Sequence, residues 1–271
     1  MLRELFKYIT ISVPDYVRDM GYLREAIAIE ARYQRCKEGW QSHIDNTKDT
    51  ILQAVEMCHK KEKVVVLGCG SLLDLPLREL SLSFNQVVLV DIVLMPSMKM
   101  VASLFKNVRL ITADVTGIAE KIYFGKPRPD STLPSPEPFL PDCDDHTSLV
   151  ISLNLLSQLS YIPTQYLKDR LKWKESEYLL LWENELMKSH FDALLALHCP
   201  ICLISDWQMS YIDKNGNEIE RHLTAPLLEK VKPYRQWTWS LVPYGKESRK
   251  YSVEMTVSAL LMNFKEPLKT K

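Results

Sequence analysis

The chain has 271 residues, of which 46% are hydrophobic, enough for one large domain with a substantial core. Lysine plus arginine and aspartate plus glutamate both number 34, which excludes an overall electrostatic attraction to nucleic acid or to anionic membranes. No apolar stretch approaches the ~20 residues that span a bilayer, and no signal-peptide pattern is present. We therefore expect a cytoplasmic protein without a membrane partner, and nucleic acid is disfavoured.

Residues 1–60 show apolar residues at helical spacing and predict a helical cap that roofs the ends of the strands that follow. Gly39 is expected to mark a break in this cap. Arg32 lies on one helical face with Arg35, where the pair either clamps a ligand carboxylate or forms a solvated basic face. Trp40 and His43 are candidates to line a substrate pocket, and His43 also to take part in catalysis; burial in the core is the alternative for both.

Residues 63–78 predict a strand, a glycine turn and a helix in succession. The apolar run Val64–Leu67 is typical of a parallel strand buried on both faces. It ends at Gly68-Cys69-Gly70, where two glycines let the chain turn sharply and let a ligand approach the peptide groups. A helix start near Asp74 would point free N–H groups at the same place, so the unit indicates a nucleotide-like ligand.

Two further apolar runs, residues 86–90 and 108–112, predict buried strands and are each followed by an aspartate, Asp91 and Asp114. Asp91 lies about twenty residues beyond the glycines, where a carboxylate can accept hydrogen bonds from both ribose hydroxyls. Asp114 follows the next strand in the same way. For each aspartate the alternative is a loop residue or a helix N-cap.

A proline-rich insertion at about 125–147 comes next and cannot continue a helix or a central strand. It is either a mobile cover over the substrate or a disordered decoration.

The fourth strand, residues 149–153, is followed by Asn154 and Gln158, which either orient a nucleophile by hydrogen bonds or cap the next helix. The fifth strand, residues 201–204, leads to Asp206, a candidate general base or ligand for a substrate amine. Cys199 and Cys202 have C-x-x-C spacing, but no second pair completes a zinc site, so no metal is expected. Residues 236–262 alternate around a turn and predict a closing antiparallel hairpin.

The G-x-G turn, Asp91, Asp114 and the closing hairpin together resemble class I S-adenosylmethionine-dependent methyltransferases, with no subfamily identified. The resemblance covers roughly residues 60–262. It implies an α/β, Rossmann-like fold with a mostly parallel seven-stranded sheet, a C-terminal antiparallel hairpin and the helical N-terminal cap. It divides the chain into the cap, 1–60, and a cofactor-binding domain, 61–271.

The implied cofactor is S-adenosyl-L-methionine, and the resemblance assigns its contacts to residues at the strand ends. These are Gly68, Cys69, Gly70, Asp91, Ile92, Asp114, Val115 and Asn154. Asp206 and His43 are then the catalytic candidates, and Trp40, Arg32 and Gln158 the substrate-binding ones. Two positions depart from the family pattern: Val66 replaces the usual acid and Leu72 a frequent third glycine. The usual route for holding the cofactor's amino group is therefore either missing or supplied elsewhere.

The implied activity is methyl transfer to an unidentified acceptor. A small molecule is favoured because the charge is neutral, the cap is aromatic and the D/N-P-P-Y signature of base-methylating enzymes is missing. The alternatives are a protein side chain as acceptor, a non-catalytic protein that kept the fold, and an NAD-dependent oxidoreductase. Two features disfavour the oxidoreductase. Leu73 stands where a dinucleotide fingerprint has its third glycine, and the closing hairpin is not typical of dehydrogenase sheets.

Overall fold

The computed structural model describes residues 2–264, which fold around one eight-stranded sheet. The helices are α1 (Leu2–Thr10), α2 (Asp15–Met20), α3 (Tyr22–Met57), α4 (Leu77–Ser83), α5 (Pro96–Ala102), α6 (Ala119–Gly125), α7 (Tyr161–Leu171) and α8 (Glu177–Leu195), with short 3-10 turns η1 (Leu156–Gln158) and η2 (Pro226–Leu228). The strands are β1 (Lys63–Leu67), β2 (Gln86–Asp91), β3 (Val108–Thr112), β4 (Thr147–Leu153), β5 (Ile201–Asp213), β6 (Glu218–Leu223), β7 (Arg235–Val242) and β8 (Tyr251–Met262).

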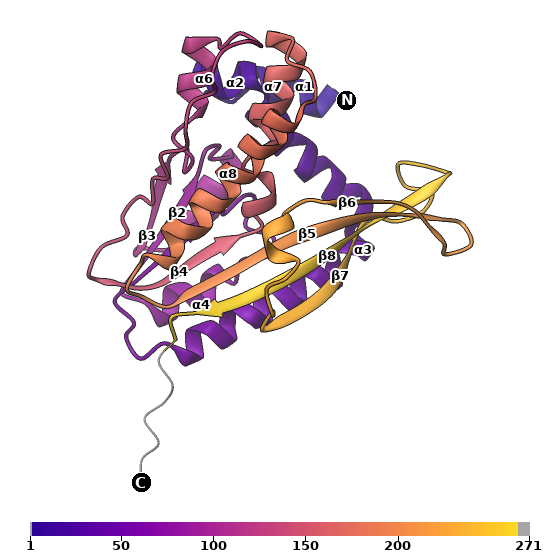
Figure 1. Cartoon of the computed structure of the whole chain (residues 1–271). Helices are drawn as coiled ribbons and strands as arrows, with labels where there is room; N and C mark the ends of the chain where they lie inside the picture. Colours follow the sequence, from indigo (N-terminus) through magenta and orange to yellow (C-terminus); the bar gives the residue numbers. More distant parts are fainter. Residues whose placement is uncertain (1, 265–271) are drawn as a thin grey trace.

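The strand order β3-β2-β1-β4-β5-β8-β7 confirms the predicted fold class. The first five strands are parallel, and β8 runs antiparallel between β5 and β7. The strand not expected from the sequence is β6, which pairs with the far end of the long strand β5. The antiparallel strands extend well past the parallel part of the sheet (Figure 1).

Alternating side chains of the central strands supply two separate cores because successive residues point to opposite faces. Val64 and Val66 of β1 pack with α3, α4 and α5 on one face. Val65 and Leu67 pack with α8 and the 3-10 turns on the other. Figure 1 shows α3 and α4 on one side of the sheet and α8 on the other. The unbroken apolar run therefore reflects burial on both faces.

Helix α3 shares its core with the sheet and is kinked at Cys36, where φ is −117° and ψ is 19°. The expectation of a break at Gly39 was wrong by three residues. Gly39 instead allows a close approach: a Cβ there would lie 2.7 Å from the carbonyl oxygen of Ser240 on β7. The glycine is therefore needed for packing. The predicted domain boundary at residue 60 stays a prediction.

The proline-rich segment forms neither helix nor strand between Gly125 and Thr147, but it is anchored. The indole N–H groups of Trp173 and Trp182 donate to the carbonyl oxygens of Pro127 and Pro134, each at 2.9 Å. Its backbone also pairs with the loop after β3. The segment thus runs as a strap along α7, α8 and that loop.

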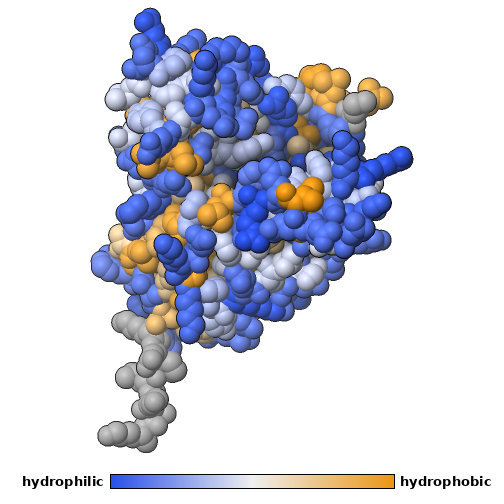
Figure 2. Space-filling model, turned by 45° about the vertical axis from the view of Figure 1, so that its right-hand side comes forward, coloured by the Kyte–Doolittle hydropathy of each residue, from blue (hydrophilic) through white to orange (hydrophobic). Residues whose placement is uncertain are grey.

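The face turned forward in Figure 2 is mostly hydrophilic, with apolar side chains in several separate groups. Among the helices of residues 2–264, none combines the length and the apolar character needed to span a membrane.

Candidate active site

A cavity of about 870 Å³ lies where the carboxyl ends of the parallel strands meet α3, between Tyr22 and Ile44, and the antiparallel strands. Every candidate residue from the sequence lines it. They are Arg32, Trp40, His43, Gly68, Cys69, Gly70, Asp91, Ile92, Asp114, Val115, Asn154, Gln158 and Asp206. No residue from 126 to 146 does so, which means that the proline-rich strap does not cover the cavity in this structure.

The two positions of the turn after β1 require glycine for different structural reasons. Both adopt left-handed backbone angles, with φ of +78° at Gly68 and +48° at Gly70. A Cβ at Gly68 would lie 2.8 Å from the carbonyl oxygen of Leu153, so a side chain there would collide with β4. A Cβ at Gly70 would meet nothing within 4 Å. Gly68 is required by packing, whereas Gly70 keeps open a space that a ligand can fill.

The carboxylate of Asp91 is fixed at the tip of β2 by two backbone donors. Its Oδ2 accepts from the N–H of Gly70 at 2.8 Å, and its Oδ1 accepts from the N–H of Val93 at 3.1 Å. Burial raises the pKa of Asp91 above its ordinary value, and the bonds from Val93 and Gly70 act against that rise. Each oxygen keeps a further acceptor position, which suits a ligand with two neighbouring hydroxyls.

Asp114 organises the loop between β3 and α6. Its Oδ1 accepts from the N–H and the hydroxyl of Thr116, and its Oδ2 accepts from the N–H groups of Ile118 and Ala119. These four bonds fill the acceptor positions of the carboxylate. The arrangement is the loop-residue alternative, because the N-cap of α6 is Ile118. The predicted contact of Asp114 with the cofactor would have to replace one of these bonds.

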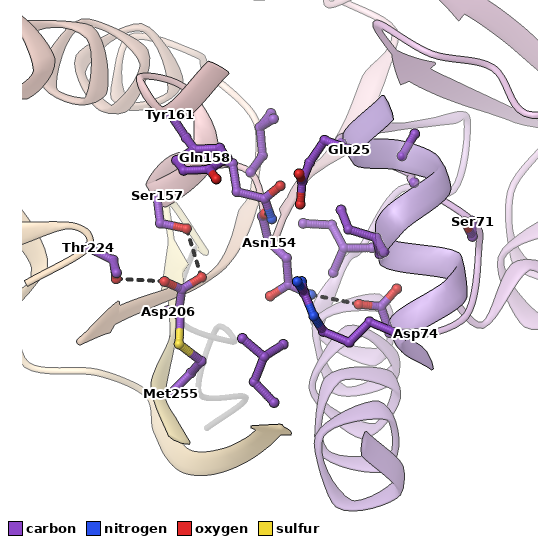
Figure 3. Close-up of a pocket in the computed structure, with 18 of the residues that line it drawn as sticks. Glu25, Ser71, Asp74, Asn154, Ser157, Gln158, Tyr161, Asp206, Thr224 and Met255 are labelled. Atoms are coloured by element: carbon purple, nitrogen blue, oxygen red, sulfur yellow. Dashed lines mark hydrogen bonds between the residues drawn. The ribbon is translucent and has the colours of Figure 1, made fainter. Parts of the chain in front are cut away.

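Asn154 follows β4 directly and also has a left-handed backbone, with φ of 46°. Its Nδ2 donates to Oδ2 of Asp74 at 2.6 Å, while its Oδ1 is buried without a hydrogen-bond partner. Gln158 donates through Nε2 to the backbone carbonyl of Asn154 at 2.6 Å. Figure 3 shows Asn154 between Asp74 and the other polar side chains that turn toward the cavity.

His43 lies behind Asp74 in a buried aromatic setting. The indole N–H of Trp237 donates to its Nδ1 at 3.1 Å, and its ring stacks on Trp239 with centroids 4.1 Å apart. Because an indole N–H can only donate, Nδ1 accepts and the ring proton belongs on Nε2, which lies 3.2 Å from Asn154 Nδ2 and 3.7 Å from Asp74 Oδ2. His43 is therefore placed to position Asp74. Neither of its ring nitrogens has a free lone pair that could accept a proton, so its catalytic role stays a prediction.

Trp40 anchors α3 to the antiparallel strands. Its Nε1 donates to the carbonyl oxygen of Leu241 at 2.9 Å, and its ring meets Trp239 edge-on at 4.8 Å. Only 5% of the residue is exposed, so the core role left open by the sequence accounts for Trp40, and substrate contact stays a prediction.

Arg32 and Arg35 together bind a carboxylate, which is the side chain of Glu247 and not a ligand. Arg32 Nε lies 3.4 Å from Oε2 of Glu247, in the loop between β7 and β8, and Arg35 binds the other oxygen of Glu247. Burial acts to raise the pKa of Glu247, and the guanidinium groups outweigh it, so the pKa is lowered. Within the described chain Arg32 is thus already paired, and its predicted contact with substrate is untested.

Asp206 is a carboxylate held by two hydroxyl groups from different elements. Ser157 donates to its Oδ1 at 2.7 Å and Thr224 to its Oδ2 at 2.6 Å, as Figure 3 shows. The residue is 3% exposed, and this burial raises its pKa. A buried carboxylate with a raised pKa at the edge of a cavity is suited to accept a proton.

Several polar residues of the site were not found from the sequence. Asp74 was seen only as part of a helix start, and Glu25 was not singled out. Ser157 and Thr224 carried no pattern that links them to Asp206, which lies 49 and 18 residues away from them. Glu30 ties the cap to the site, because it accepts from Ser71 at 3.3 Å and from Ser97 at 3.0 Å. Hydroxyl partners brought together by tertiary packing leave no local signal.

No protein-family model and no curated protein matches the chain in sequence. Among solved structures, it is similar to DhpI in complex with S-adenosylhomocysteine, with 12% identity, 85% of this chain and 93% of that chain covered, and a TM-score of 0.38. It is also similar to the N-methyltransferase NodS from Bradyrhizobium japonicum in complex with S-adenosylhomocysteine, with 10% identity, coverages of 96% and 97%, and a TM-score of 0.37.

A third similar structure is the glycopeptide N-methyltransferase MtfA with S-adenosylmethionine, with 11% identity, coverages of 78% and 93%, and a TM-score of 0.35. At TM-scores below 0.5 these likenesses carry no argument. The fold is instead assigned from the chain's own strand order, in which five parallel strands are followed by β8, inserted antiparallel between β5 and β7. This topology confirms the mostly parallel, Rossmann-like α/β fold with closing antiparallel strands that the sequence implied.

Proposed function

We propose that the protein transfers a methyl group from S-adenosylmethionine to a small-molecule acceptor. The observation that carries the proposal is the bond between Gly70 and Asp91 at the open end of the cavity. It places an unobstructed glycine and a carboxylate with spare acceptor positions at adjacent strand tips. That combination fits the backbone approach and the vicinal hydroxyls of an adenosyl ligand.

The residues present fit the cofactor at three points. The space above Gly70 would be filled by any side chain, Asp91 can take two more hydrogen bonds, and the buried Oδ1 of Asn154 needs a donor. S-adenosylmethionine, when bound, supplies a methyl group already activated on a sulfonium sulfur. The work left to the chain is to orient the acceptor, to exclude water and to take up a proton where the acceptor carries one.

Asp206 is the residue that we assign to proton uptake. It lies just past the last paired residue of β4 and β5, so it stands at the same edge of the sheet as Asn154. The hydroxyls of Ser157 and Thr224 fix both of its oxygens in place. Its raised pKa makes the carboxylate a better proton acceptor than an exposed aspartate.

The remaining lining indicates a neutral or cationic acceptor with apolar surface. Tyr211 and Tyr251 meet edge-on at 5.0 Å on the antiparallel strands, beside Met255. The lining is rich in carboxylates, and its arginine is already bound by Glu247. A volume of about 870 Å³ lies toward the upper end of the range for small-molecule pockets, about 300–1,000 Å³, which leaves room for a cofactor and a small acceptor.

Calorimetric titration with S-adenosylmethionine, S-adenosylhomocysteine and NAD tests the cofactor. The proposal predicts saturable binding of the first two and none of NAD. Binding of NAD alone would instead support an oxidoreductase, and no binding of any of the three would support a non-catalytic protein.

The acceptor is tested by incubating the protein with methyl-labelled S-adenosylmethionine and a cell extract. The proposal predicts enzyme-dependent label in the low-molecular-weight filtrate. Label found in the protein fraction alone would contradict a small-molecule acceptor.

A further inference from the structure

Two acceptor atoms beside the glycine turn have no donor within residues 2–264. Oδ1 of Asn154 is buried and unpartnered. The contacts of Asp74 all involve Oδ2, which receives Asn154 Nδ2 at 2.6 Å and faces His43 Nε2 at 3.7 Å, so Oδ1 of Asp74 accepts nothing. The buried Oδ1 of Asn154, left unpaired, costs free energy and therefore indicates a missing partner.

The orientation of these groups follows from their chemistry. A carboxylate can only accept, so Asn154 must turn Nδ2 toward Asp74, and its Oδ1 necessarily points the other way. His43 accepts from Trp237 through Nδ1, and its Nε2 lies 3.2 Å from Asn154 Nδ2 and 3.7 Å from Asp74 Oδ2. Among the described residues no lysine or arginine forms an ion pair with Asp74, whose side chain is 19% exposed. The missing partner is a cation with more than one N–H donor.

The pair lies where the amino-acid end of an adenosyl ligand would reach. Gly68 packs so closely on Leu153 that Asn154, the next residue, stands directly beside the glycine turn. Asp74 follows the same turn by four residues. Val66, in contrast, is fully buried in the interior of β1 and offers no polar atom to the cavity.

We propose that Asp74 and Asn154 form an ammonium-binding subsite for the amino group of the methionine part of the cofactor. The subsite rests on the proposed function and takes over the task that an acid in place of Val66 would have. Asp74 supplies the charge and Asn154 Oδ1 a neutral acceptor, while His43 and Trp237 hold Asp74 from behind. Figure 3 shows Glu25 of α3 turned toward the same space, which adds negative potential there.

The test compares two ligands that differ in the amino-acid part. S-adenosylhomocysteine carries the ammonium group, whereas 5′-methylthioadenosine has the same adenosine and sulfur without it. Calorimetry is run on the wild type, on Asp74→Asn, which removes the charge at constant size, and on Asn154→Gly, which removes Oδ1 and tolerates the φ of 46°. Asp45→Asn, an exposed carboxylate on α3, serves as the control.

Asp74→Asn and Asn154→Gly should each weaken S-adenosylhomocysteine by about tenfold or more, because a hydrogen bond to a charged group is lost. Their affinity for 5′-methylthioadenosine should change less than about twofold, and Asp45→Asn should change neither ligand. An unchanged ratio of the two affinities, or an equal loss of both, would overturn the subsite. A wild type that binds neither ligand would overturn the proposed function itself, and the subsite with it.

Discussion

The carboxylate of Asp91 and the backbone N–H of Gly70 are joined by a hydrogen bond of 2.8 Å that links the tips of β2 and β1. The bond fixes the carboxylate beside the one position of the turn where a side chain would meet open space. An acidic group and an accessible peptide are thus placed together before any ligand arrives, which lowers the cost of ordering them on binding.

Asp91→Ala should weaken the binding of S-adenosylhomocysteine by about 1–3 kcal/mol, because the ribose hydroxyls lose a charged acceptor. Calorimetry measures the affinity, and circular dichroism verifies that the fold is intact. Unchanged affinity in a folded variant would remove Asp91 from the cofactor site.

Substitutions at the two glycines should separate binding from folding. Gly70→Asn suits the left-handed backbone and places its side chain in the cavity, so affinity should fall by at least about 1.4 kcal/mol, a factor of ten, with little loss of stability. Gly68→Ala should lower the free energy of unfolding by about 1–3 kcal/mol, because its Cβ would press on the carbonyl of Leu153. Calorimetry measures the affinity and chemical denaturation the stability. Tight binding by Gly70→Asn would contradict the assignment of the space above Gly70 to the ligand.

Asp206→Asn should lower kcat by about 10²–10⁴-fold, the usual contribution of a positioned base, while leaving the affinity for S-adenosylhomocysteine nearly unchanged. Release of S-adenosylhomocysteine, followed once an acceptor is in hand, measures the rate. A variant as active as the wild type would exclude Asp206 from proton uptake.

The same substitution should raise stability at neutral pH. Burial raises the pKa of Asp206 in the folded state, so its favourable contribution is complete below the ordinary aspartate pKa of about 3.9 and is lost as pH rises through the folded value. At neutral pH the ionised, buried carboxylate costs stability that Asn does not, and the hydroxyls of Ser157 and Thr224 can reorient to accept from the amide. Denaturation with guanidinium at pH 5 and pH 8 should show a larger advantage of the variant at pH 8; a smaller one would contradict the assigned shift.

Glu247→Gln should loosen the hairpin tip from α3. The pKa of Glu247 is lowered, so the stability that it contributes is present above the unfolded glutamate pKa and is lost as pH falls through the folded value. The variant should be less stable at pH 7, by no more than about 1 kcal/mol for a partly exposed pair. The deficit should shrink in acid and in high salt. A deficit independent of both would mean that packing, and not the ion pairs with Arg32 and Arg35, attaches the tip.

The parallel part of the sheet and the strand-tip residues were predictable because local patterns encode them. A strand buried on both faces needs a continuous apolar run such as Val64–Leu67, and the residue that ends each run stands at the ligand-facing edge. Asp91 and Asp206 follow from that rule alone. Strand β6 was missed because all of its residues are exposed, so burial left no mark on its sequence.

The partners of the predicted residues were not predictable. Helical spacing gives Trp40 a buried face but does not say that it meets Leu241, about two hundred residues later. In the same way, Arg32 looked free for a ligand until the fold brought Glu247 to it. The unpaired oxygen of Asn154 exists only once Asp74 fixes the direction of its amide. Contacts between distant segments decide which polar atoms stay available.

A crystal structure with S-adenosylhomocysteine would locate the cofactor in the protein. It should show the ribose hydroxyls within hydrogen-bonding distance of Asp91, the homocysteine chain passing over Gly70, and the sulfur facing the part of the cavity that Asp206 lines. Adenosine density in any other cavity, or a ribose turned away from Asp91, would contradict the proposed site.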